Sequence, residues 1–191
     1  MENLCVFCGS SSGFHPIYQK AAVKLGIKLA EENLRLIYGG GGVGLMGILA
    51  NTVMEHGGYV TGVIPKFLYD KEVGLDDCTD LHIVDSMHER KQMMAELSHG
   101  FIALPGGIGT LEELFEIFTW SQLALIKKPV AIYNVNHFYD DLINHLNHMV
   151  KEGFLKDNNL SSLIISHNIH ELIAKIQAYN YTETSKWIDK T

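Results

Sequence analysis

The segment Pro105–Glu113, PGGIGTLEE, combines residue types that bind phosphate with residue types that perform acid–base chemistry. It follows the apolar run Phe101–Leu104 and leads into a helical pattern over Leu111–Leu123. A buried strand, a glycine turn and a helix in this order direct free backbone N–H groups and the positive end of the helix dipole towards the turn, which favours a phosphate. Glu112 and Glu113 are expected in the first helical turn, where they repel an anion unless at least one acts on the ligand. We therefore predict a phosphorylated small-molecule ligand and chemistry upon it.

Two interpretations of Glu113 are open at this stage. Thr110 and Glu113 match the S/T-x-x-E capping box, in which the carboxylate only satisfies a backbone N–H at the helix start. A carboxylate at the mouth of the helix also lies within reach of the anomeric carbon of a phosphosugar, or of its attacking water. The two roles are compatible, and Glu112 is expected to point sideways.

The segment Ser86–Lys91, SMHERK, places Arg90 and Lys91 in the opening turns of another predicted helix. The helix dipole disfavours a cation there by about 0.3–1 kcal/mol. Pairing of Arg90 with Glu89 is the ordinary explanation of such an arginine. Because this helix begins at the same sheet edge as the glycine turns, we expect Arg90 to face the ligand, while Lys91 fits a ligand contact and a solvated side chain equally well.

Three turns rich in glycine or serine each follow a predicted strand and precede a predicted helix: Gly9–Gly13, Gly39–Gly44 and Pro105–Gly109. Such turns gather at the carboxyl edge of a parallel sheet, where ligands bind at a change in strand order. Small residues also permit tight turns, which explains one such segment more easily than three. We predict that one pocket uses all three turns.

The stretch Gly42–Gly47 satisfies G-x-G-x-x-G, the dinucleotide fingerprint. It follows the second predicted strand instead of the first, and the next strand ends in Ile64–Lys66 without an acid for a ribose hydroxyl. NAD binding is therefore the weaker alternative. The additional glycines indicate backbone lying close to a flat ligand, although close helix packing explains Gly47 equally well.

Apolar runs and helical patterns alternate along the chain, which predicts an α/β fold: a Rossmann-like parallel sheet flanked by helices on both faces, as a single domain. We expect a nucleotide-binding catalytic domain over residues 1–179 and a C-terminal tail over 180–191. The connection Lys66–Asp80 is polar and long. The predicted strands are Leu4–Cys8, Leu34–Tyr38, Tyr59–Ile64, Leu81–Val84, Phe101–Leu104, Val130–Tyr133 and Leu163–Ile165, and the predicted helices are Pro16–Glu32, Leu45–His56, Met87–His99, Leu111–Leu123, Tyr139–Glu152 and Ile169–Tyr179.

Composition narrows the class of protein. The 191 residues are 47% hydrophobic, the formal net charge is −7, and no block of Lys or Arg stands out. A nucleic-acid partner and a membrane partner are therefore not expected. The N-terminal sequence lacks a basic region followed by a long apolar stretch, and three cysteines fit a reducing compartment, so we expect a cytoplasmic protein.

Two cysteines and two histidines have spacings that suggest a metal site at first sight. Cys5 and Cys8 form C-x-x-C inside an apolar run, but strand positions three apart point to opposite faces, which favours two buried thiols. His145 and His148 have helical i, i+3 spacing without a third ligand of matching pattern, which is typical of a solvated helix face. We therefore predict no metal site and no cofactor.

Taken together, the motifs GSSSG, GGGGVGLMG, SMHERK and PGGIGTLEE, in this order along the chain, resemble those of the LONELY GUY-type phosphoribohydrolases, a family formerly labelled lysine decarboxylases. The resemblance covers roughly Leu4–Glu171. It implies hydrolysis of the N-glycosidic bond of N6-modified adenosine 5′-monophosphates, or of AMP itself, to the free base and ribose 5-phosphate. A noncatalytic nucleotide carrier or sensor on the same scaffold is the alternative.

The resemblance also implies roles for individual residues. Arg90 and Glu113 correspond to the family's catalytic pair, and the family's homodimeric assembly suggests a homodimer for which helix Leu111–Leu123, with Phe115, Phe118 and Trp120, offers a surface unless those side chains are core. The substrate-binding residues expected are Gly40, Glu72, Met87, Lys91, Gly107, Ile108, Gly109, Thr110 and Glu112.

Overall fold

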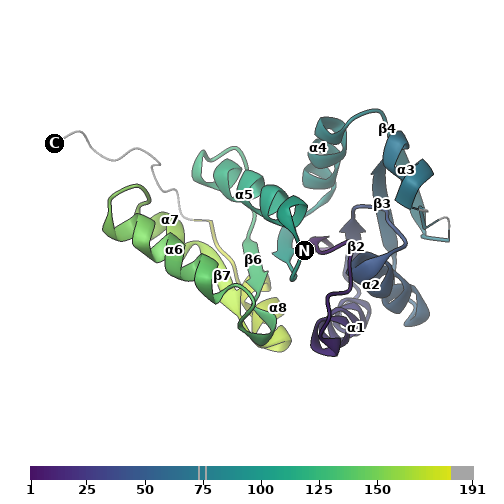
Figure 1. Cartoon of the computed structure of the whole chain (residues 1–191), viewed down its shortest axis with the longest axis horizontal. Helices are drawn as coiled ribbons and strands as arrows, with labels where there is room; N and C mark the ends of the chain where they lie inside the picture. Colours follow the sequence, from purple (N-terminus) through teal and green to yellow (C-terminus); the bar gives the residue numbers. More distant parts are fainter. Residues whose placement is uncertain (73, 76, 182–191) are drawn as a thin grey trace.

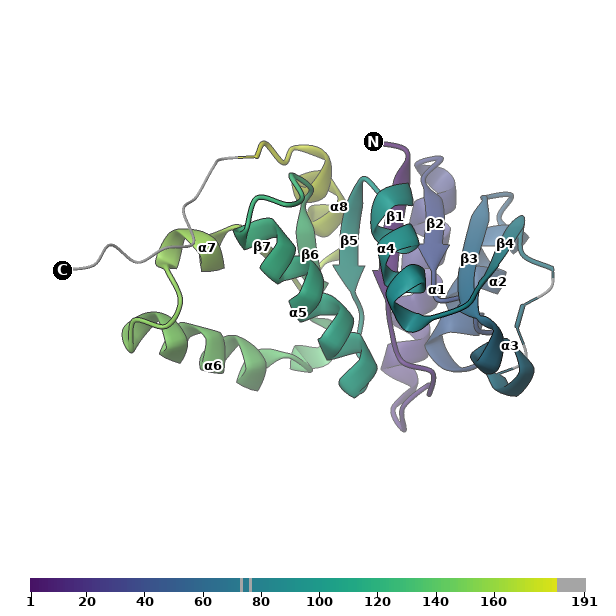
Figure 2. The same ribbon diagram turned by 90° about the horizontal axis from the view of Figure 1, so that it is seen from above.

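The computed structural model of the chain describes residues 1–72, 74, 75 and 77–181. A seven-stranded parallel sheet in the order β4-β3-β2-β1-β5-β6-β7 runs through the middle of the molecule (Figures 1 and 2). The strands are β1 (Asn3–Phe7), β2 (Arg35–Tyr38), β3 (Val60–Pro65), β4 (Asp80–Val84), β5 (Gly100–Ala103), β6 (Val130–Tyr133) and β7 (Leu163–Ser166). The helices are α1 (Pro16–Glu31), α2 (Gly44–Glu55), α3 (Lys66–Glu72), α4 (Met87–Leu97), α5 (Ile108–Gln122), α6 (Asp140–Lys151), α7 (Asp157–Ser161) and α8 (Ile169–Gln177), with a short 3-10 helix η1 (Val135–His137).

Helices cover both faces of the sheet, which confirms the predicted α/β class. One core cluster joins the sheet to α1, α2 and α8, and a second joins the opposite face to α4, α5 and α6. Figure 1 shows α1 and α2 on one side of the strands and α4 and α5 on the other. The central strands are buried on both faces, because successive side chains point to opposite sides of a strand.

The two cysteines of C-x-x-C illustrate this alternation. Cys5 lies in the core cluster of α4 and α5, whereas Cys8 lies in the cluster of α1 and α2. Both thiols are free and buried, and burial raises the pKa of each well above its ordinary value. The predicted pair of buried thiols on opposite faces is confirmed.

The predicted strands and long helices all occur, with ends that differ by up to three residues. The sequence analysis missed three short elements: α3 inside the connection Lys66–Asp80, η1, and α7. Each has at most seven residues, which is too few to show a helical period. The predicted tail lies almost wholly outside the described residues, since 182–191 are not described.

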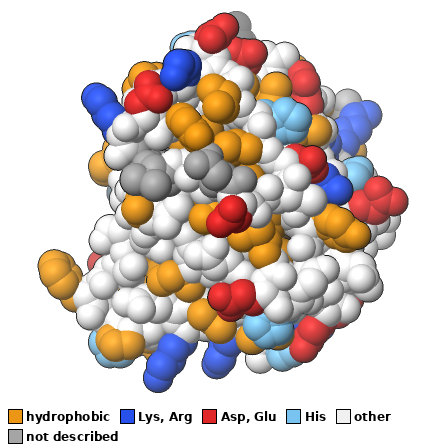
Figure 3. Space-filling view, turned by 90° about the vertical axis from the view of Figure 1, so that its right-hand side faces the viewer, with side chains coloured by type: hydrophobic (Ala, Val, Ile, Leu, Met, Phe, Trp, Pro, Cys, Tyr) orange, Lys and Arg blue, Asp and Glu red, His pale blue; other side chains and the backbone are white. Residues whose placement is uncertain are grey.

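On the face shown in Figure 3, lysine and arginine side chains are scattered among acidic and hydrophobic ones. Within the described residues, every helix is too short or too polar to cross a lipid bilayer.

Candidate active site

The three glycine-rich turns meet at the carboxyl edge of the sheet, between β1 and β5. Chain connections from β1 lead towards β2, whereas those from β5 lead towards β6, so the strand order reverses at this point. Parallel sheets leave a crevice at such a reversal because the helices that follow the two strands lie on opposite faces. The structure therefore brings together the three turns that the sequence analysis assigned to one pocket.

Backbone hydrogen bonds and close backbone contacts connect the three turns. The Gly9 N–H donates to the carbonyl of Pro105 at 3.1 Å, and the Gly9 carbonyl accepts from the N–H of Leu45 at 3.0 Å. Gly44 has φ +61°, and a Cβ added there would lie 2.3 Å from the carbonyl carbon of Ser10. Only glycine fits this approach, so the second glycine of G-x-G-x-x-G serves the packing of two loops.

A cavity of about 260 Å³ opens at this edge. It is bounded by the ends of β1 and β2, by α4 and by the first turns of α5. Its lining residues are Val6, Phe7, Cys8, Gly9, Ser10, Gly39, Met46, Met87, Arg90, Met94, Gly107, Ile108, Gly109, Thr110, Glu112 and Glu113.

Helix α5 begins three residues earlier than the sequence predicts, and this corrects the capping box. Gly107 is the N-cap, and its carbonyl accepts the first helical bond, from Leu111 N–H at 3.2 Å. Thr110 is buried inside the first turn against Gly106, where an added Cβ would lie 2.1 Å from the threonine hydroxyl. Glu113 therefore lies in the second turn and caps nothing, because the packing of Thr110 overrides the local motif.

Gly107 and Gly109 leave the helix start bare on the cavity side. A Cβ added to either glycine meets no atom within 4 Å in the described part of the chain. Packing within the fold therefore does not require glycine at these two positions. The open space lies over the N–H groups that begin α5, which have no partner inside the helix.

Arg90 is buried in the wall of the cavity with few partners of its own. Its guanidinium lies against the backbone of Gly39, where an added Cβ would come within 1.9 Å of Nη2. Nη1 contacts the thioether of Met87 at 3.8 Å, and Nε has no hydrogen-bond partner in the structure. A charged group in this state is incompletely compensated, which favours an anionic ligand.

Glu113 lies beside Arg90 in the wall of the cavity. Its Oε1 lies 3.7 Å from Arg90 Nη2, beyond hydrogen-bond distance, and the two side chains are only 11% and 9% exposed. Burial raises the pKa of the Glu113 carboxyl to about 7, a shift that the Arg90 charge opposes but does not cancel. The acid therefore changes its charge near neutral pH, as an acid–base catalyst requires.

Lys91 points away from the cavity and joins α4 to α5. Its Nζ bonds to Glu112 Oε1 at 2.6 Å and to Glu116 Oε1 at 3.0 Å. Burial lowers the pKa of Lys91, but the two carboxylates outweigh this effect and bring it above its usual value. Glu112 both lines the cavity and belongs to this ion pair.

Eight of the eleven predicted site residues line the cavity. Lys91 and Gly40 are not among the lining residues. Gly40 has φ +78° and its carbonyl accepts from the N–H of Leu75 at 3.1 Å, which ties the long connection to the second glycine turn. Glu72 is the last residue of α3, and the prediction for its side chain lies outside the described part of the structure.

Apart from Met87 and Ile108, the sequence analysis missed the apolar members of the lining. Met46 and Met94 come from α2 and α4, and Val6 and Phe7 from the end of β1. Their types are those of ordinary core residues, so no local signal distinguishes them. Only the position of a residue at the carboxyl end of β1 points to the cavity.

Comparison with known proteins assigns the chain to a family. A family model described as "Possible lysine decarboxylase" matches residues 46–176. The cytokinin riboside 5′-monophosphate phosphoribohydrolase of Oryza sativa subsp. japonica is 45% identical over 178 residues, which are 93% of this chain and 74% of that protein. The chain belongs to the cytokinin riboside 5′-monophosphate phosphoribohydrolase family. An Arabidopsis thaliana member is likewise 45% identical, over 177 residues that cover 93% of this chain and 82% of that one.

Solved structures outside this family share the fold. A molybdenum cofactor binding protein from Rippkaea orientalis superimposes with a TM-score of 0.69 at 21% identity, covering 93% of this chain and 96% of that one. The molybdenum cofactor carrier protein of Chlamydomonas reinhardtii gives 0.69 at 19% identity with the same coverage. The family thus uses a scaffold that also occurs in proteins with a carrier role.

Proposed function

We propose that this chain hydrolyses the N-glycosidic bond of adenosine 5′-monophosphates, N6-modified or plain, and releases the free base and ribose 5-phosphate. Membership of the phosphoribohydrolase family supports the reaction. The observation that carries the proposal is the buried, incompletely paired Arg90 facing a Glu113 whose pKa is about 7, beside a bare helix start.

The start of α5 is the proposed phosphate site. Backbone N–H groups of Gly107, Ile108 and Gly109 have no partner inside the helix, and the helix dipole favours an anion there. The absence of side chains on both glycines leaves room for phosphate oxygens. Ile108 is 82% exposed and Thr110 is buried in the same turn, so the exposed backbone provides the contacts.

Glu113 and Arg90 are the proposed catalytic residues. Breaking the glycosidic bond builds positive charge on the ribose, which an ionised Glu113 stabilises while it accepts a proton from the attacking water. The departing purine takes up negative charge, which the guanidinium of Arg90, adjacent to Glu113 in the cavity wall, compensates. The hydroxyl of the water bonds to C1′ as the glycosidic bond breaks, and the proton that Glu113 took from the water passes to the departing base, which returns Glu113 to its ionised form.

Two alternative functions fit the site less well. A noncatalytic nucleotide carrier needs the glycine turns but gains nothing from a buried carboxylate that faces the ligand and destabilises the fold. A lysine decarboxylase needs a lysine that forms a Schiff base with its cofactor, and no lysine lines the cavity in the described part of the chain. We therefore favour the hydrolase.

The proposal includes assembly as a homodimer in the cytoplasm. Phe118 is core, whereas Trp120 is only partly buried and Leu123 and Leu125 are 40% and 67% exposed at the end of α5. These three apolar side chains, here called the α5-end patch, are the proposed dimer surface. Three free cysteines support a reducing compartment.

Incubation with AMP, isopentenyladenosine monophosphate and the matching nucleosides, followed by chromatography, tests the activity. We expect free base from the monophosphates and little from the nucleosides, because binding of the phosphate positions the glycosidic bond. Equal turnover of adenosine and AMP would show that phosphate binding does not position the glycosidic bond. Tight AMP binding without base release would show the carrier function instead.

A further inference from the structure

A second cavity, of about 380 Å³, lies between α1 and the start of α8 and shares no lining residue with the catalytic cavity. One wall is a face of α1 with Lys24, Lys28 and Glu31, which follow one another at i, i+4 and i+7. Tyr133, at the end of β6, and the segment 167–170 complete the lining. Small-molecule sites usually measure about 300–1,000 Å³, so this cavity has the size of a ligand site.

Tyr133 presents a buried hydroxyl group without a partner to this cavity. Its side chain is only 6% exposed and packs in the core cluster that joins the sheet to α1 and α8. Burial raises the pKa of the phenol, and its hydroxyl forms no hydrogen bond within the described residues. A buried tyrosine hydroxyl usually has a partner, as that of Tyr139 does in the carbonyl of Leu104 at 2.7 Å. The Tyr133 hydroxyl is therefore a donor available to a ligand.

The charged side chains of α1 in this wall are unequally compensated. Lys28 pairs with Glu32, one turn further along the same helix. Lys24 and Glu31 both line the cavity but form no ion pair with any residue in the described ranges. A ligand that combines an anionic group with hydrogen-bond donors satisfies both side chains.

The start of α8 adds a positive pole to the opposite wall. Asn168 caps this helix, because its Oδ1 accepts from the N–H groups of His170 at 2.9 Å and Glu171 at 3.2 Å. Its carbonyl accepts from the N–H of Leu172 at 2.9 Å. Of the first four N–H groups of α8, that of Ile169 remains, and Ile169 lines the cavity. The helix dipole favours an anion beside it.

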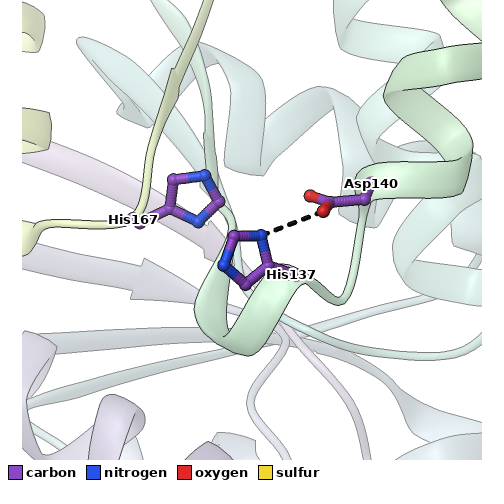
Figure 4. A group of neighbouring side chains, drawn as sticks. All are labelled: His137, Asp140 and His167. Atoms are coloured by element: carbon purple, nitrogen blue, oxygen red, sulfur yellow. Dashed lines mark hydrogen bonds and ion pairs between the residues drawn. The ribbon is translucent and has the colours of Figure 1, made fainter.

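Hydrogen bonds and ring contacts fix His167 in the cavity wall. Its Nδ1 donates to the carbonyl of Asn134 at 2.7 Å, since a carbonyl only accepts, and this leaves Nε2 as an acceptor. The ring centroid of His137 lies 4.5 Å from that of His167, and His137 bonds in turn to Asp140 at 2.9 Å (Figure 4). His137 and Asp140 do not line the cavity, so Nε2 of His167 is the acceptor that this group offers to a ligand.

We propose that this second cavity binds a small organic anion, a phosphate or a carboxylate that also carries hydroxyl groups. Lys24, the Tyr133 hydroxyl and the Ile169 N–H bind the anionic group, and Glu31 and His167 Nε2 accept from the hydroxyl groups. Such a ligand provides the partner that the buried phenol lacks, through a hydrogen bond strengthened by charge. The site is distinct from the proposed catalytic site, because Arg90 and Glu113 do not line it.

Ribose 5-phosphate and gluconate are the probes, since they carry a phosphate and a carboxylate on hydroxylated chains, and ribose is the neutral control. Ribose 5-phosphate also fits the catalytic cavity, so the readout is the NMR signal of the His170 imidazole, which lines the second cavity and not the first. Titrations at fixed pH and ionic strength compare wild type with Tyr133→Phe and Lys24→Gln. Tyr59→Phe and Lys20→Gln are the matched controls: Tyr59 is 60% exposed, Lys20 lies one turn before Lys24 on α1, and neither lines the cavity.

We expect a saturable shift of the His170 signal with at least one of the two anions and none with ribose. Binding should be at least tenfold weaker in Tyr133→Phe and at least threefold weaker in Lys24→Gln, while both controls keep the wild-type affinity. Without ligand, Tyr133→Phe should keep the wild-type thermal midpoint, because it removes a hydroxyl group that has no partner.

Three results would overturn the proposal: no saturable shift with either anion, an equal shift with ribose, or full affinity in Tyr133→Phe. A lower thermal midpoint of ligand-free Tyr133→Phe would do so as well, since it would give the hydroxyl a structural partner. Arg90→Met should leave the His170 shift unchanged, so the test stands or falls separately from the proposed hydrolase activity.

Discussion

Glu113 couples the stability of the fold to its charge. Its pKa is 4.5 in an ordinary setting and about 7 in the folded chain, because burial disfavours the carboxylate. Below pH 4.5 the folded and unfolded chains both hold the proton. Between pH 4.5 and 7 only the folded chain keeps it, so the free energy of unfolding falls as pH rises, and the loss is complete above pH 7.

Replacement of Glu113 by glutamine removes this pH dependence. The amide resembles the protonated acid, so we expect Glu113→Gln to match the wild type near pH 5 and to exceed its unfolding free energy by about 3 kcal/mol at pH 8. Urea unfolding of both proteins from pH 5 to 8 measures the difference in unfolding free energy. The contributions of the other titrating groups are the same in both proteins and cancel in this difference. If the unfolding free energies of the two proteins change with pH in the same way from pH 5 to 8, Glu113 has an ordinary pKa.

The same variant tests catalysis. We expect Glu113→Gln to lose about 10²- to 10⁴-fold in base release, and the wild-type kcat/KM to rise with pH to a plateau with an inflection at about 7, where the catalytic carboxylate ionises. Steady-state assays of AMP cleavage at fixed ionic strength give both values. Near-normal turnover in the variant would reduce Glu113 to a buried structural acid.

Arg90 is expected to contribute to the reaction at the expense of stability. It lies in the opening turns of α4, against the helix dipole, and its buried guanidinium is only partly compensated. Arg90→Met should therefore leave the thermal midpoint at pH 6 unchanged or higher, because a buried charge gives way to an apolar chain while Glu113 is protonated. Turnover, and the stabilisation that AMP gives, should both be lost. A variant that unfolds more easily yet stays active would make Arg90 an ordinary ion-pair partner.

At the scale of elements, the glycines of the turns fall into two kinds. Gly107 and Gly109 leave the backbone at the start of α5 uncovered. At Gly44, by contrast, the φ of +61° and the close contact with Ser10 require glycine. Gly109→Ala should raise stability by about 0.4–1 kcal/mol, because alanine narrows the unfolded ensemble at a helical position. Both Gly107→Ala and Gly109→Ala should raise the KM for AMP at least tenfold by crowding the phosphate.

Gly44→Ala is the contrasting variant for that series. The added methyl meets loop backbone, so we expect a loss of about 1–3 kcal/mol in unfolding free energy. Thermal melts and steady-state kinetics on the three variants separate the two kinds of glycine. An unchanged KM in both Gly107→Ala and Gly109→Ala would place the phosphate elsewhere.

At the scale of the whole molecule, we propose that the α5-end patch forms the dimer interface. If it does, a charge at Leu125, which is 67% exposed, should make Leu125→Glu a monomer. Phe154→Glu is the matched control, since Phe154 is 84% exposed and lies beyond α6. Light scattering after size-exclusion chromatography gives the mass of each variant. A monomeric wild type, or a dimer that survives Leu125→Glu, would rule out this surface.

The sequence by itself determined the order of the strands and the long helices, and most of the polar and glycine residues that meet at the cavity. Parallel strands place all their carboxyl ends at one edge, so turns that follow β1, β2 and β5 had to converge there. Arg90 and Glu113 were identifiable for the same reason, since each lies in the first two turns of a helix that follows a strand. Local sequence patterns predict strands and helices because the spacing of apolar residues in each of them repeats every few positions.

The tertiary structure alone decided the start of α5, the pKa of Glu113 and the pairing of Lys91. The capping box was wrong because Thr110 packs against Gly106, a contact that propensity does not contain. The pKa of Glu113 depends on burial in the cavity wall and on the charge of Arg90, which lies 23 residues earlier in the chain. His137 and His167 follow the neighbouring strands β6 and β7, and only the pairing of these strands brings the two side chains together. No sequence motif identifies them as neighbours. Distances between side chains on different elements depend on how the elements pack. Local sequence patterns predict the helices and strands but not this packing.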